Sequence, residues 1–169
     1  MLTGDSVLLR VAVEADVPIL ASIRAEPEVH ARWRGDNLAQ EVADSIASDE
    51  LTVYVVELHG EAIGAIQSYE ETDRDYRHAG IDIYLAPQFH GKGLGSDAVR
   101  TLVRHLLAVE GHHRIVIDPA ADNEPAIAAY RKVGFRVVGT MRQYERGDDG
   151  QWHDGVLMEL LADDFEAAP

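Results

Sequence analysis

A glycine-rich run from Gln88 to Ser96 (QFHGKGLGS) holds the residues best suited to chemistry in this sequence. Apolar residues alternate with polar ones before it and recur at helical spacing after it, so the glycines fall where a strand gives way to a helix. At a helix N-terminus the first N–H groups lack partners, the helix dipole is positive, and residues without a Cβ let an anion approach the backbone. Lys92 adds a mobile cation. The run therefore predicts a phosphate-binding loop.

Two familiar phosphate-binding motifs match this run only in part. A P-loop requires Ser or Thr directly after its lysine, whereas Lys92 is followed by Gly93. The dinucleotide fingerprint G-x-G-x-x-A is met by Gly93, Gly95 and Ala98, and Asp118 ends a later apolar segment where an acidic ribose ligand is expected. An extra segment separates the preceding strand from the glycines, which this motif does not allow. A dinucleotide-binding protein without enzymatic activity therefore stays as the alternative of another class.

The spacing Q-x-x-G-x-G, formed by Gln88, Gly91 and Gly93, resembles the acetyl-coenzyme A loop of the GNAT superfamily of N-acetyltransferases. A second segment, residues 123–135 (NEPAIAAYRKVGF), resembles the family's next motif, in which an Asn starts a helix and a Tyr leads into a Gly-Phe turn. Taken alone, this segment is also ordinary helix punctuation, because Asn is a common N-cap and Gly a common C-terminal residue. The two motifs occur here in the family's order.

The resemblance implies an α/β (α+β) fold in one domain over residues 1–169. The sheet is expected to be mixed and mostly antiparallel, with about six to seven strands, flanked by helices and splayed at its centre. It also implies that acetyl-CoA is the cosubstrate, with its pyrophosphate at the glycine loop and its arm in the splay. The cofactor-binding residues expected are Gln88, His90, Gly91, Lys92, Gly93, Leu94, Gly95, Ser96, Asn123 and Tyr130.

Three catalytic residues follow from the same resemblance, which puts the thioester between Asp82, Asp118 and Tyr130. Tyr130 matches the family's general acid for the leaving thiolate. Asp82 or Asp118 would take the amine's proton through water, although the ordinary pKa of a carboxyl, about 4, suits binding a cationic acceptor better than it suits a base. By helical periodicity alone Tyr130 would be a core aromatic, because it shares a stripe with Ala126 and Ala129.

Within the family, six short groups of residues resemble the aminoglycoside 6′-N-acetyltransferases. They are QSY at 67–69, ETD at 71–73, GID at 80–82, GKGLG at 91–95, DP at 118–119 with Asn123, and AI at 126–127 with Tyr130 and GF at 134–135. This resemblance implies that acidic residues hold the acceptor's ammonium and hydroxyl groups, and that the chain confers antibiotic resistance. The expected substrate-binding residues are Trp33, Tyr54, Gln67, Glu71, Asp73, Asp82 and Asp118. Another amine, such as a siderophore lysine, a polyamine or a protein N-terminus, stays as the alternative acceptor.

Composition limits the classes of partner. The chain has 169 residues, no cysteine and a formal net charge of −15, from 30 acidic and 15 basic residues. The length predicts one domain without disulfides, and the absence of a signal-peptide pattern or a long apolar run predicts a cytoplasmic protein that does not enter membranes. The negative charge argues against nucleic acid and favours a small cationic amine. We expect no metal, a surface position for the pair His112-His113, and a monomer or homodimer.

The elements that must position these residues can be placed from hydrophobic periodicity. Helices are expected over 14–24, from 94 onward and from 123 to 133. Residues 26–48 form a variable segment with two short helical patterns, which we interpret as a flap over a pocket. Strands are expected at 7–11, 51–58, 62–69, 80–85, 114–117, 136–145 and 155–160, the second and third joined by a short Gly-containing hairpin turn.

Overall fold

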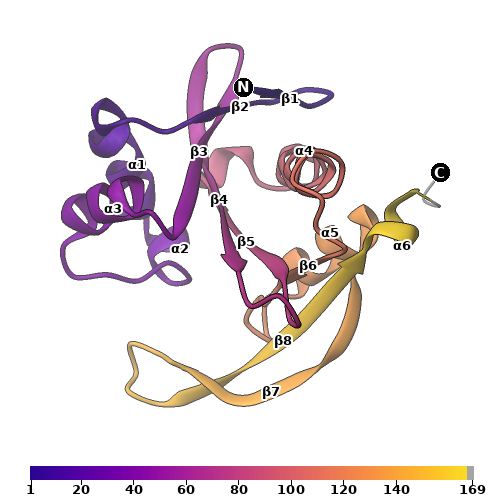
Figure 1. Ribbon diagram of the computed structural model, residues 1–169. Coiled ribbons are helices and arrows are strands. Elements are labelled where there is room, and N and C mark those ends of the chain that lie inside the picture. The colour runs from indigo at the N-terminus through magenta and orange to yellow at the C-terminus, as the bar shows by residue number, and fades with distance from the viewer. Residues whose placement is uncertain (167–169) are drawn as a thin grey trace.

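An eight-stranded sheet forms the centre of the fold in the computed structural model, which describes residues 1–166 (Figure 1). The strands lie in the order β1-β2-β3-β4-β5-β6-β8-β7, and neighbours are antiparallel except for the parallel pair β5 and β6. Their bounds are β1 (Leu2–Thr3), β2 (Leu8–Val11), β3 (Leu51–Leu58), β4 (Glu61–Glu71), β5 (His78–Leu85), β6 (Arg114–Ile117), β7 (Arg136–Arg146) and β8 (Trp152–Leu161). The predicted fold class is confirmed. The strand number is higher than expected because the short N-terminal segment β1 pairs with β2.

Helices cover both faces of the sheet. The 3-10 turn η1 (Glu14–Asp16) leads into α1 (Val17–Arg24), which packs with α2 (Pro27–His30) and α3 (Leu38–Ala47) on one face. The turn η2 (Pro87–Phe89), α4 (Leu94–Ala108) and α5 (Glu124–Val133) lie on the other, and α6 (Ala162–Glu166) follows β8. Successive residues of β3 alternate between the two cores, as the period of a strand requires. Within residues 1–166, no helix is both long and apolar enough to cross a membrane.

The hairpin between β3 and β4 turns at His59 and Gly60, whose φ angles are 52° and 84°. Positive φ at both positions is the geometry of a type I′ turn, whose twist matches that of the flanking strands. This confirms the predicted hairpin.

The parallel strands β5 and β6 stay together for only a short distance. They pair at Ala79↔Ile115 and Gly80↔Val116. Beyond this point β6 and the residues after it follow β8, since Ile117 pairs with Met158 and the amide of Val156 donates to the carbonyl of Pro119 at 2.9 Å. The second half of β5 therefore leaves β6 and opens the splay that the resemblance implied.

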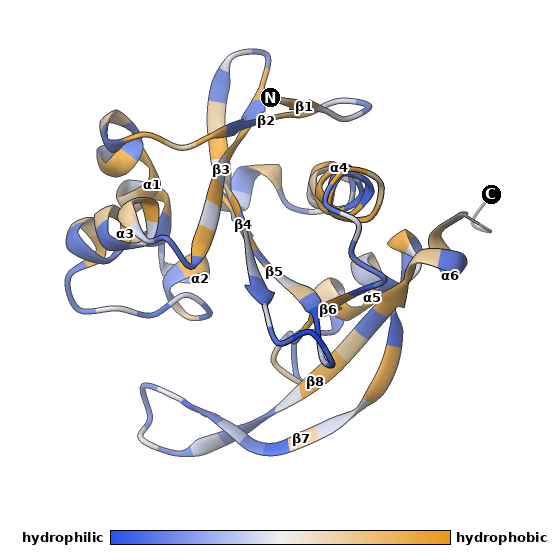
Figure 2. Ribbon diagram, in the orientation of Figure 1, coloured by the Kyte–Doolittle hydropathy of each residue, from blue (hydrophilic) through white to orange (hydrophobic). Residues whose placement is uncertain are grey.

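The hairpin of β7 and β8 is long and bends away from the body of the sheet (Figure 1). Its pairing shifts register between Val137 and Gly139 and again between Met141 and Glu145. Such bulges increase strand twist and redirect side chains. The loop at its far end is hydrophilic (Figure 2).

Candidate active site

A cleft of about 950 Å³ opens where β5 and β6 separate. Its walls come from the segment after α2, the ends of β5 and β6, the N-termini of α4 and α5, and the β7–β8 hairpin. Many of the residues predicted from the sequence lie on these walls. They are Trp33, Gln67, Asp82, His90, Gly93, Gly95, Ser96, Asp118, Asn123 and Tyr130.

The glycine loop forms one end of the cleft. Gly93 is the N-cap of α4 with a left-handed φ of 81°, and Gly91 has a φ of 71°. A Cβ added at either glycine would meet no atom within 4 Å, so both face open space. The first bond of the helix runs from Asp97 N to Gly93 O at 3.0 Å, which leaves the preceding N–H groups without helical partners. This open cradle at a positive helix end fits a pyrophosphate.

His90 and Asp97 hold this loop in place. A ring nitrogen of His90, Nε2, lies 2.8 Å from the Leu85 carbonyl oxygen and so ties the loop to the end of β5. The Asp97 carboxylate accepts from the amides of Ser6 and Val7 at 2.7 and 3.0 Å and anchors the N-terminal segment to α4. Asp97 is therefore turned away from the cleft and leaves the cradle positive.

Some residues predicted to bind the cofactor do not line the cleft. They are Gln88, Gly91, Lys92 and Leu94. Leu94 is buried in the core beneath the loop. The ammonium of Lys92 lies 5.6 Å from the ring centre of Phe89, where it makes a cation–π contact. The loop thus offers its backbone to the cleft more than its side chains.

The other end of the cleft holds two acidic residues. Asp82 lies on β5 opposite Gln67 of β4, whose side-chain amide donates to its carboxylate at 3.3 Å. Burial raises the pKa of Asp82 to about 6, the negative charge of Asp118 acts in the same direction, and the bond from Gln67 opposes both. The Asp82 carboxyl therefore changes between its protonated and ionised forms at about pH 6.

Tyr130 faces the same space from α5. Its ring packs against the core, with the centre of the Phe135 ring 6.2 Å away. Burial raises the pKa of Tyr130, and the charges of Asp82 and Asp118 raise it further, so the phenol stays protonated. Tyr130 thus packs against the core as an aromatic and also lines the cleft, where its protonated phenol is available. Similarly, Asn123 lines the cleft while its side chain caps α5 by accepting from Ala126 N at 3.3 Å.

Tyr144 of β7 is a cleft residue that sequence reasoning missed. The nearby Asp118 side chain is the main cause of its raised pKa, with burial and the charges of other neighbours adding to it. The residue is 52% exposed, and its ring lies over Gly155 of β8, where an added Cβ would come within 2.9 Å of it. The register shift between Met141 and Glu145 sets this position. No local pattern in the sequence signals it.

Two arginines from the segment after α2 border the end of the cleft that holds Asp82 and Asp118, which we call the acceptor end. Arg32 pairs with Asp122 at 2.5 Å, and Arg34 pairs with Glu145 of the hairpin. The segment 26–48 thus borders the cleft, as its interpretation as a flap requires. Six carboxylate residues but only these two arginines line the cleft, and neither Asp82 nor Asp118 forms an ion pair within residues 1–166. The acceptor end therefore favours a cation.

Three residues predicted to bind substrate lie outside the cleft. Tyr54 is a core residue of β3 that is only 5% exposed, since its side chain points to the face covered by α4. Glu71 and Asp73 are exposed, and the Glu71 carboxylate accepts from the Asp73 amide in the loop after β4.

The expected surface position of His112 is also wrong, because its ring is buried beside Glu70 and Glu110. Within residues 1–166, no group of three or more His, Cys, Asp or Glu side chains is arranged to hold a metal.

Comparisons with known proteins agree with this geometry. The model of the acetyltransferase (GNAT) family matches residues 20–135. Aminoglycoside N(6′)-acetyltransferase type 1 of Klebsiella pneumoniae is 35% identical over 159 residues, which cover 82% of this chain and 78% of that protein. Spermidine N(1)-acetyltransferase of Escherichia coli K12 is 30% identical over 114 residues, covering 68% of this chain and 60% of that protein. The crystal structure of the aminoglycoside acetyltransferase AAC(6′)-Ib with coenzyme A and kanamycin superposes with a TM-score of 0.79 at 32% identity, covering 95% of this chain and 98% of that one.

Proposed function

The chain belongs to the acetyltransferase (GNAT) family, and on that premise we propose that it transfers an acetyl group from acetyl-CoA to the 6′-amine of an aminoglycoside. One observation carries the proposal. The cleft joins a positive helix N-terminus at one end to the carboxylates of Asp82 and Asp118 at the other, which no basic side chain in the described part of the chain neutralises. It is thus built for an anionic cosubstrate and a cationic acceptor that meet in the middle.

Acetyl-CoA fits the first half of this cleft. The N–H groups around Gly93 to Ser96 would hold the pyrophosphate, and the unpaired edge of β5 beyond Gly80 would hold the pantetheine arm. Acetyl-CoA supplies the thioester whose acetyl group is transferred. The same edge of β5 offers backbone N–H donors for the carbonyl oxygen as it gains negative charge.

The side chains of the cleft then manage two protons. The attacking amine must be neutral, and Asp82, ionised above pH 6, accepts its proton through water. Tyr130 donates its phenolic proton to the sulfur as the new C–N bond forms and the C–S bond breaks, and it regains a proton from the acetylated nitrogen, which loses one to become the neutral amide. Asp118, held beside the Tyr144 hydroxyl, binds another ammonium group of the acceptor and so orients the reacting amine.

An acceptor panel tests the proposal. The chain contains no cysteine, so a thiol reagent reports only the coenzyme A released by turnover. We expect kcat/KM for a kanamycin-type aminoglycoside to exceed that for spermidine, or for a peptide with a free N-terminus, by at least about tenfold, or 1.4 kcal/mol. Turnover of spermidine alone would instead assign the chain to the polyamine acceptors. Absence of turnover with any aminoglycoside would overturn the proposal.

A further inference from the structure

Arg34 covers two carboxylates of the β7–β8 hairpin at the acceptor end of the cleft. Its Nη2 pairs with the carboxylate of Glu145, and its Nε lies 3.7 Å from a carboxylate oxygen of Asp148. Its Nη1 donates to the carbonyl of Ala31 at 3.2 Å. All four residues line the cleft, yet the reaction derived above uses none of them.

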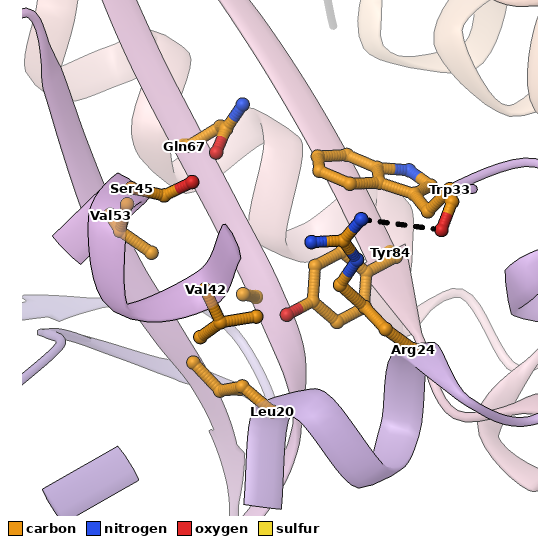
Figure 3. A pocket seen from close by; sticks show the side chains of 9 residues that line it. Leu20, Arg24, Trp33, Val42, Ser45, Val53, Gln67 and Tyr84 are labelled. Atoms are coloured by element: carbon orange, nitrogen blue, oxygen red, sulfur yellow. Dashed lines mark hydrogen bonds between the residues drawn. The ribbon is translucent and has the colours of Figure 1, made fainter. Parts of the chain in front are cut away.

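A buried arginine fixes the backbone that carries Arg34. Arg24 of α1 has a side chain that is only 8% exposed, and its Nη2 donates to the carbonyls of Trp33 and Arg34 at 3.4 and 2.8 Å. The Trp33 ring packs edge-on against Tyr84, with 4.8 Å between the ring centres (Figure 3). Surface ion pairs contribute little partly because two long side chains lose entropy when they meet. The side chain of Arg34 is 22% exposed and starts from this fixed backbone, so its ion pairs lose less.

The ion pairs at this end divide the six carboxylates of the cleft into two groups. Four have a basic partner, and they are Glu145 and Asp148 (with Arg34), Asp122 (with Arg32) and Asp149 (with His153). The other two, Asp82 and Asp118, have no such partner among residues 1–166. The ammonium groups of an acceptor therefore find free negative charge at Asp82 and Asp118, but they meet a guanidinium at the hairpin.

We propose that Arg34 is a specificity-determining residue, which limits the number of ammonium groups that the acceptor end binds. The inference rests on the proposed function and deepens it. Asp82 and Asp118 attract the ammonium groups close to the reacting amine, whereas Arg34 withholds Glu145 and Asp148 from any further one. The guanidinium also repels a cation placed beside the hairpin, and a like charge of this kind selects against the wrong ligand. The favoured acceptor therefore carries neutral groups where it faces the hairpin.

Substitutions at the Arg34–Glu145 pair change the charge beside the hairpin in both directions. The positive charge of Arg34 and the two negative charges of Glu145 and Asp148 leave one net negative charge in wild type. Arg34→Gln adds a second net negative charge, Glu145→Gln leaves none, and the double variant restores the wild-type value. A unit charge about 4 Å from an ammonium in water changes its affinity about fivefold, or ~1 kcal/mol.

The test uses pairs of kanamycin-type acceptors that share the ring bearing the 6′-amine and differ by an amine in place of a hydroxyl on another ring. The readout is the ratio of kcat/KM for the amine-richer acceptor to that for its partner. For at least one pair, this ratio should rise about fivefold over wild type in Arg34→Gln and fall about fivefold in Glu145→Gln. The double variant should return to within about twofold of wild type. Arg104→Gln, which removes the same charge from the exposed face of α4, is the matched control and should leave the ratio unchanged.

Ionic strength supplies a second measurement. The difference between Arg34→Gln and wild type should shrink as sodium chloride is added, because salt screens charges that face solvent. Thermal unfolding and the Kd of acetyl-CoA, measured for each variant, separate a changed acceptor preference from a damaged fold. If Arg34→Gln does not fold, Glu145→Gln still tests the predicted fall in the ratio.

Two results would overturn this inference and leave the proposed function standing. One is a ratio that stays at the wild-type value in both single variants for every acceptor pair. The other is a ratio that moves in the same direction in both, as loss of a purely structural contact between the flap and the hairpin predicts. Absence of turnover with any aminoglycoside would overturn both the inference and the proposed function.

Discussion

Replacing Asp82 with Asn should make the protein less active and, as the pH rises, progressively more stable than wild type. The carboxyl of Asp82 is half-buried at the cleft, and its pKa in the folded state is about 6, against an ordinary value of 3.8. A raised pKa means that the folded state holds the proton more tightly than the unfolded state. The stability that this group contributes is therefore fully present below about pH 4 and is lost as the pH rises through about 6.

The magnitude follows from the two pKa values. A difference of about 2 units corresponds to roughly 3 kcal/mol against the ionised form in the folded protein. Of this, about 1.4 kcal/mol is lost in wild type between about pH 5 and about pH 7.5. The Asn side chain does not titrate and can still accept from Gln67. The difference in unfolding free energy between variant and wild type should grow by that amount over this range.

Urea denaturation across this pH range measures the difference directly. Asp73→Asn, which changes an exposed acid outside the cleft, is the matched control. The same preparations should show that kcat/KM of wild type rises with an apparent pKa of about 6. Asp82→Asn should lose this rise and about 10²-fold or more of the rate. Parallel stability curves for variant and wild type would refute the argument that burial disfavours the ionised carboxyl.

Three further substitutions test other parts of the cleft. Tyr130→Phe should stay packed against the core and lower kcat about 10²-fold with the KM for acetyl-CoA unchanged; unaltered release of coenzyme A would exclude it as the acid. Gly93→Ala should lower the unfolding free energy by roughly 1–2 kcal/mol, because Gly93 has a positive φ, and it should raise the Kd of acetyl-CoA about tenfold. The control Gly60→Ala, which is equally strained in the β3–β4 turn, should leave that Kd unchanged. Asp118→Asn should raise the KM for a kanamycin-type acceptor about tenfold without affecting that for acetyl-CoA, and an equal effect on both would contradict its assignment to the acceptor.

Local patterns in the sequence predicted the glycine turn before α4 and the N-terminus of α5, which border the cleft. The glycines before α4 and the N-cap Asn123 could be predicted because the conformation of a turn or a helix end depends mainly on the few residues that form it. The hairpin at His59 and Gly60 was predictable for the same reason. The positions of Asp82 within β5 and of Asp118 just after β6 required the family resemblance, because the splay between these strands is set by long-range pairing.

The acceptor half depends on contacts that no local pattern encodes. Arg34 and Glu145 meet across 111 positions of the chain, and the register shift in β7 brings Tyr144 to Asp118. The burial of single strand residues was equally hard to predict, because a shift of one residue in the pairing register turns a side chain to the opposite face of the sheet. Tyr54 faces the core for this reason, although the resemblance assigned it to the substrate.

Identification of the product tests the central claim most directly. The purified protein would be incubated with acetyl-CoA and a kanamycin-type aminoglycoside, and the product analysed by mass spectrometry and NMR. The structure and the family assignment predict a product with one acetyl group, carried by the 6′-amine. Acetylation at a different amine, or an unmodified aminoglycoside under conditions in which spermidine or a peptide N-terminus is acetylated, would contradict it.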